Sequence, residues 1–87
     1  MDFRLTVHAE RELIQRQIPR KLLIDTLDAP QQIVPEMFGR KAYQSKLDFA
    51  EGGIYLLRAI VDESTVPFAV VTVYRTKKFE RYWRDQS

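Results

Sequence analysis

The chain lacks cysteine, so disulfides, thiolate metal sites and a cysteine nucleophile are excluded. It has a single histidine, His8, and its carboxylates are scattered, so the clustered ligands of a metal site are missing and we expect no metal and no cofactor. No apolar run exceeds four residues, as in 68–71, far short of the ~20 residues that cross a bilayer. The N-terminus also lacks the apolar core of a signal peptide. We therefore expect a cytoplasmic protein with no membrane partner.

Glycine is scarce, with 3 residues, and two of them sit together at Gly52 and Gly53, which is a hairpin signal. There is no repeat, low-complexity run or Gly/Ser linker, so residues 1–87 are expected to form a single domain. Hydrophobic residues make up 45% of the chain and charged residues 30%, which is typical of a globular protein. A core this small favours further burial against a partner, and a homodimer is one such assembly.

The hydrophobic periodicity changes from helical to alternating about one third of the way along the chain. A short opening strand (3–7) precedes a helix that Thr6 caps and that runs to about Gln17. Pro19 fits the first turn of a second helix, which Pro30 ends. The later segments predict strands at 31–35, 43–49, 54–61 and 68–74 and a final helix capped by Thr76. We expect an α+β fold: two N-terminal helices packed on a four-stranded, mainly antiparallel sheet, with a short basic C-terminal helix.

Arg58 interrupts an otherwise apolar eight-residue strand, and it is the clearest anomaly in the sequence. Burying an unpaired guanidinium is costly, so this side chain needs a partner. Two interpretations remain open: a structural ion pair, or an arginine that binds an anion.

The C-terminal segment 75–84 is the second anomaly, because it carries a net charge of +4 while the rest of the chain nets −2. Its cations are Arg75, Lys77, Lys78, Arg81 and Arg84. Two of them fall in the first turn of the expected helix, where the dipole favours acids, and this arrangement predicts a bound anion such as phosphate. The aromatic residues among them, Tyr74, Tyr82 and Trp83, are typical of stacking on unpaired bases. The alternative is a solvated basic helix, with Phe79 and Trp83 simply packed on the sheet.

His8 lies at the start of the first helix. A lone histidine can serve as a general acid or base near neutral pH, although a capping or supporting hydrogen-bond role is the commoner use. With no metal site, phosphate loop or nucleophile elbow in the sequence, the enzymatic option left is metal-free cleavage of RNA, which carries its own 2′-hydroxyl nucleophile.

The ordered motifs resemble those of the bacterial family called domain of unknown function 4258, whose recurrent opening is His-Ala-x-x-Arg. The segments that carry the resemblance are residues 6–11, Arg16 with Ile18, Gly39–Arg40 with Tyr43, and residues 71–75. More distantly, the layout and the segment 75–82 resemble the BrnT and RelE/ParE toxins. This second resemblance implies a small toxin that acts on RNA, often on ribosome-bound mRNA, and that an antitoxin protein holds inactive.

The resemblance to RelE-type toxins implies basic residues on a central strand and near the C-terminus, together with a C-terminal tyrosine. We therefore predict a toxin-like, metal-independent endoribonuclease with catalytic residues Arg58, Arg75, Tyr82 and His8. The predicted RNA-binding residues are Lys77, Lys78, Arg81, Arg84 and Tyr74. This hypothesis requires the basic residues to converge on one concave face, and it predicts that Arg58→Ala leaves the fold intact. The alternatives are a non-catalytic RNA-binding or protein-binding module of the same fold, or a basic tail that docks only an acidic protein.

Overall fold

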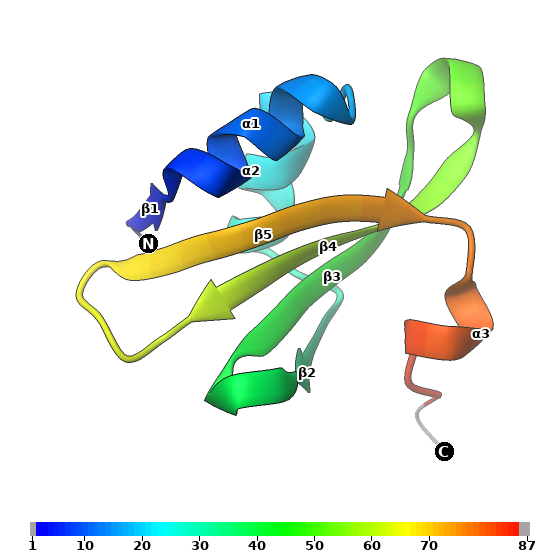
Figure 1. Ribbon diagram of the computed structural model, residues 1–87. Helices are drawn as coiled ribbons and strands as arrows, with labels where there is room; N and C mark the ends of the chain where they lie inside the picture. The colour runs from blue at the N-terminus through cyan, green and yellow to red at the C-terminus, as the bar shows by residue number, and fades with distance from the viewer. Residues whose placement is uncertain (1, 86–87) are drawn as a thin grey trace.

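The computed structural model describes residues 2–85, which form a five-stranded sheet with helices on both faces (Figure 1). The elements, in chain order, are β1 (Phe3–Leu5), α1 (Val7–Gln15), α2 (Arg20–Asp28), β2 (Gln32–Pro35), β3 (Lys41–Asp48), β4 (Ile54–Asp62), β5 (Phe68–Thr76) and α3 (Phe79–Tyr82). Short 3₁₀ turns at Met37–Gly39 and Ala50–Gly52 precede β3 and β4. The α+β class and the order of elements are therefore as predicted.

The sheet has the strand order β1-β5-β4-β3-β2 and differs in detail from the expected one. The pairs β2–β3, β3–β4 and β4–β5 are antiparallel, as expected of a meander. The opening strand adds a fifth member, because β1 pairs in parallel with β5. The sheet is thus mixed and five-stranded: the opening strand itself was predicted, but the four-stranded, mainly antiparallel sheet that we expected did not include it.

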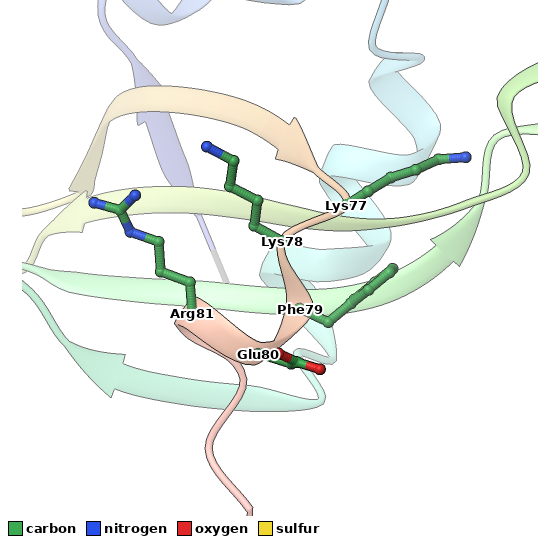
Figure 2. Close-up of a pocket in the computed structure, with 5 residues that line it drawn as sticks. All are labelled: Lys77, Lys78, Phe79, Glu80 and Arg81. Carbon is green, nitrogen blue, oxygen red and sulfur yellow. The ribbon is translucent and has the colours of Figure 1, made fainter.

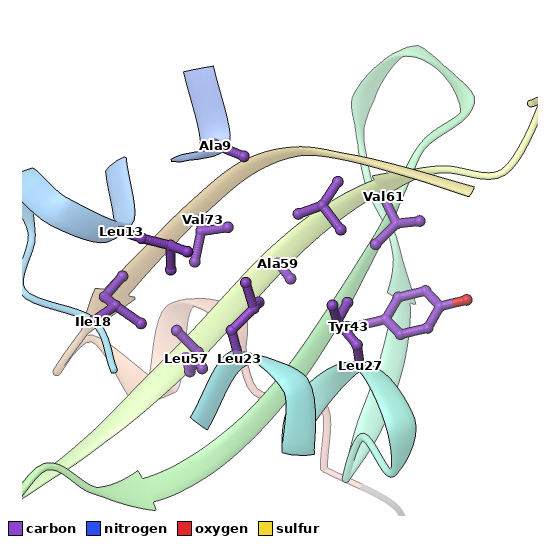
Figure 3. Close-up of a cluster of buried hydrophobic side chains, with 11 residues drawn as sticks. Ala9, Leu13, Ile18, Leu23, Leu27, Tyr43, Leu57, Ala59, Val61 and Val73 are labelled. Carbon is purple, nitrogen blue, oxygen red and sulfur yellow. The ribbon is translucent and has the colours of Figure 1, made fainter. Parts of the chain in front are cut away.

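The two N-terminal helices cover one face of the sheet (Figures 1 and 3). Thr6 caps α1 as predicted, since its hydroxyl accepts the Ala9 amide hydrogen at 3.1 Å. Apolar side chains of α1, α2, the connection between them, and β3, β4 and β5 form the main core: Ala9, Leu13, Ile18, Leu23, Leu27, Tyr43, Leu57, Ala59, Val61, Val70 and Val73. A smaller cluster, Val34, Ala42 and Ile60, lies apart from this core.

Alternation along β4 explains the two clusters. Leu57, Ala59 and Val61 point toward α1 and α2, so Arg58 and Ile60 point to the opposite face. We call the first the helix face and the second the tail face, because the C-terminal segment lies against it.

The final helix is shorter than expected. It is a single turn, and Lys78 rather than Thr76 precedes its first residue. The Thr76 hydroxyl instead accepts the Lys78 amide hydrogen at 3.0 Å within a local turn. Lys77 and Lys78 therefore lie before the helix, and the prediction that they occupy its first turn is wrong. A helix of one turn also provides little dipole and few free amides to support an anion there.

Candidate nucleic-acid interface

A row of four polar side chains crosses the tail face of the sheet. Gln32, Gln44, Arg58 and Tyr74 are register partners on four adjacent strands. Gln44 donates to Gln32 Oε1 at 2.8 Å, Arg58 Nε donates to Gln44 Oε1 at 2.8 Å, and Arg58 Nη1 donates to the Tyr74 hydroxyl. Each buried polar group in the row thus finds its partner on the neighbouring strand.

Arg58 is the centre of this row and has only 3% of its surface exposed. Its third bond runs from Nη2 to Glu36 Oε2 at 3.0 Å, which forms an ion pair with the residue that follows β2. The ring of Tyr82 lies over the guanidinium, with 4.1 Å between its centroid and Cζ. The structure therefore places Arg58 in an ion pair beneath an aromatic ring, and a ligand reaches it only if Tyr82 moves.

The same row fixes the C-terminal segment. The Gln32 side chain bonds both backbone groups of Arg84: Oε1 accepts the amide hydrogen at 3.1 Å and Nε2 donates to the carbonyl. Gln44 Nε2 also donates to the Tyr82 carbonyl at 3.1 Å. Two glutamine amides thus hold a segment that has only one helical turn of its own.

Tyr74 and Tyr82 come together above Arg58, with ring centroids 6.1 Å apart in an edge-to-face arrangement. Burial raises the pKa of Tyr74 above its ordinary value, the neighbouring Tyr82 adds to the rise, and Arg58 opposes it. The Tyr74 phenol therefore keeps its proton at neutral pH.

The predicted basic residues do not converge on one face. Lys78 and Arg81 are exposed and point to the same side of the C-terminal segment, away from Lys77 (Figure 2). Residues 77–81 line a shallow cavity of about 390 Å³. Arg81 also approaches the Tyr82 ring, with 5.5 Å between Cζ and the centroid. We call Lys78, Arg81 and Tyr82 the tail cluster.

Arg75 faces the other way, because it is the register partner of Leu57 on the helix face. Its guanidinium carbon lies 4.8 Å from the ring centroid of Phe49 and 4.7 Å from that of Tyr55. Lys77 joins them, with Nζ 4.8 Å from the Tyr55 centroid. We call these four residues the hairpin cluster, because the two rings flank the β3–β4 turn.

The five cations of segment 75–84 are alike in their lack of ion pairs within residues 2–85. Within residues 2–85 the ion pairs involve His8, Arg16, Arg20, Lys21, Lys41 and Arg58. None of the five cations of segment 75–84 lies within 4.0 Å of a carboxylate in that part of the chain. Crowded like charges without partners lower stability and attract a polyanion.

His8 lies apart from these clusters, on α1 above the helix face. Its Nε2 is 3.4 Å from Glu12, and Arg16 is 3.1 Å from the same carboxylate. Glu12 is buried, and Oε1 accepts the Val73 amide hydrogen at 2.9 Å. The predicted catalytic set is thus divided: Tyr82 is on the tail face with Arg58, while Arg75 and His8 are on the other side of the sheet.

Sequence analysis missed the residues that support these groups. The acceptors and donors that bond Arg58 and the C-terminal segment come from Gln32, Gln44 and Glu36. These residues become neighbours only through strand register. Glu12 was detectable, because it lies four residues from both His8 and Arg16 on one helix.

No three His, Asp or Glu side chains of residues 2–85 come together as a metal site would require. No helix in this range is long and apolar enough to cross a membrane.

Comparisons with protein-family models, with curated proteins and with solved structures found no match to this chain. The sequence also departs from the His-Ala-x-x-Arg opening at one position: Glu12, not arginine, follows His8 by four residues. Glu12 is a buried carboxylate on the helix face, and it accepts a hydrogen bond from the β5 backbone.

Proposed function

We propose that the protein is an RNA-binding module with a RelE/BrnT-like layout, and that the cations of segment 75–84 hold the phosphate backbone. The observation that supports this proposal is the group of five cations that have no carboxylate partner among residues 2–85, next to partly exposed aromatic rings. Phosphate contacts of this kind release counterions and supply most of the affinity of non-specific binding. Aromatic rings next to such cations stack on unpaired bases.

Fluorescence anisotropy of a labelled, unstructured RNA, titrated at several salt concentrations in EDTA, tests this function. The double variant Lys78→Ala/Arg81→Ala removes two exposed cations from the tail cluster. We expect weaker binding and a slope of log K against log salt that is reduced by about 0.7 per lost contact. Arg11→Ala/Lys21→Ala is the matched control, because it also removes two exposed cations, one on α1 and one on α2. Equal affinity and equal slope for all three proteins would contradict the proposal and would favour docking of an acidic protein.

A metal-independent endoribonuclease is the second candidate, in the manner of a toxin with an antitoxin partner and ribosome-bound mRNA as substrate. Its support is the position of the Tyr82 phenol beside Tyr74 and over Arg58. In this reaction the 2′-oxygen bonds to phosphorus and releases its proton to solvent. The bond from phosphorus to the 5′-oxygen breaks, and the Tyr82 phenol protonates that oxygen. Arg75 and His8 take no part, because they are on the other side of the sheet from Arg58 and Tyr82.

Tyr82→Phe separates the two functions, because it keeps the ring over Arg58 and removes only the phenolic proton. For an endoribonuclease we expect intact binding and loss of the 2′,3′-cyclic phosphate product in EDTA. If the unchanged protein binds RNA but leaves it uncut, both alone and in the presence of ribosomes, the RNA-binding module remains and the enzyme is rejected.

A further inference from the structure

The end of β5 separates two groups of cations by strand alternation. Tyr74 is on the tail face and Arg75 on the helix face. Beyond the strand, Lys77 points toward the β3–β4 hairpin, whereas Lys78 points to the same side as Arg81 (Figure 2). The two clusters are therefore on opposite faces, joined only by the short segment 76–78. A straight, rigid ligand lying on one face reaches one cluster and not the other.

The hairpin cluster has the chemistry of a base-stacking site. Phe49 and Tyr55 are partly buried and meet edge-to-face, with 5.4 Å between their centroids, and two cations lie near the Tyr55 ring. Gly52 accommodates this ring, because a Cβ atom at that position would lie 2.5 Å from Tyr55 Cε1. Neither Arg75 nor Lys77 has a carboxylate partner among residues 2–85. Aromatic rings with unpaired cations bind unpaired bases together with their phosphates.

We propose that the hairpin cluster is a second RNA subsite, and that one single strand bends around the end of β5 to occupy both clusters. This inference rests on the proposed RNA binding and adds the class of RNA. A single strand can make the turn and present an unpaired base to Tyr55, whereas the bases of a duplex are stacked and its helix is stiff. The protein therefore selects single-stranded over double-stranded RNA.

Anisotropy titrations with three labelled RNAs test the path: a strand of about 12 nucleotides, a strand of about 4, and the longer strand annealed to its complement. For the longer strand, Tyr55→Leu should lower the affinity roughly 5- to 150-fold, the loss expected for one stacked base. Tyr55→Phe keeps the ring and should bind like the unchanged protein. Lys77→Gln should reduce the salt slope by about 0.7, while Lys21→Gln, a matched charge removal on α2, should not. The duplex should bind more weakly than the longer strand and should not respond to Tyr55→Leu.

The outcomes distinguish the second RNA subsite from the proposed RNA binding on which it depends. If the unchanged protein binds the longer strand and Lys78→Ala/Arg81→Ala weakens binding, but Tyr55→Leu and Lys77→Gln do not, the second subsite is rejected and the RNA-binding module stands. Equal affinity for strand and duplex also rejects the bent path. Failure of the unchanged protein to bind any of the three RNAs rejects the proposed function and this inference with it. Circular dichroism of each variant ensures that a loss of affinity is not a loss of fold.

Discussion

Arg58→Ala is expected to destabilise the protein strongly, contrary to the sequence-based prediction that it leaves the fold intact. The guanidinium is 3% exposed and donates to three acceptors on three different segments. Removing it leaves Gln44 Oε1 buried without a donor, which costs about 1–3 kcal/mol. Glu36 is left without its cation, and the space beneath Tyr82 is emptied.

Together these losses amount to about 3–5 kcal/mol, the usual cost of removing one partner of a buried ion pair. This is a large part of the roughly 5–15 kcal/mol by which small domains are stable. Urea denaturation followed by circular dichroism measures the change in the free energy of unfolding. Arg58→Met retains most of the side-chain volume, so it should cost less than Arg58→Ala and thereby separate packing from charge. Arg11→Ala is the matched control, because Arg11 is an exposed arginine on α1. It should change the free energy of unfolding by no more than about 0.5 kcal/mol.

A loss below about 1 kcal/mol for Arg58→Ala would refute the reasoning, since it would mean that water replaces the guanidinium at all three acceptors. The expected loss also has a consequence for function. Weaker RNA binding or absent cleavage by Arg58→Ala would report the unfolding of the tail face rather than a contact between Arg58 and RNA. Tyr82→Phe and Lys78→Ala/Arg81→Ala are better probes, because they leave the buried row intact.

Two further predictions concern groups on the helix face. Burial and a hydrogen bond to Glu63 raise the pKa of Tyr43 to about 12, so its contribution to stability is fully present below pH 10 and is lost as the pH rises toward 12. Unfolding free energies measured between pH 9 and 12 should fall less for Tyr43→Phe than for the unchanged protein; equal slopes would exclude Tyr43 as the cause. Glu12→Ala should cost about 1–3 kcal/mol and speed hydrogen exchange of the Val73 amide, because that buried donor loses its acceptor. Glu12→Gln retains an acceptor oxygen, so the Val73 amide should stay more protected in this variant than in Glu12→Ala. An equal loss of protection in both variants would contradict the assignment of that protection to the hydrogen bond.

Local rules predicted most of the elements of the fold. The Thr6 cap, the second helix ending before Pro30 and the hairpin at Gly52–Gly53 each depend on a few neighbouring residues, and the structure confirms them. The parallel pairing of β1 with β5 joins residues more than sixty positions apart, so no local pattern predicts it. The buried row has the same origin: Gln44 and Gln32 look like ordinary polar strand residues until register places them beside Arg58.

The prediction that the basic residues converge on one face, in contrast, conflicts with the alternation of side chains along a strand, which the sequence alone provides. Tyr74 and Arg75 are consecutive in a strand, so their side chains point to opposite faces whatever the register. Because Tyr74 pairs with Arg58 on the tail face, Arg75 points to the helix face, and the sheet lies between the two arginines. A ligand that engages both sides of the sheet must therefore pass around the end of β5. A flexible single strand meets this requirement, whereas a compact substrate on one face would leave the two cations of the other cluster unused.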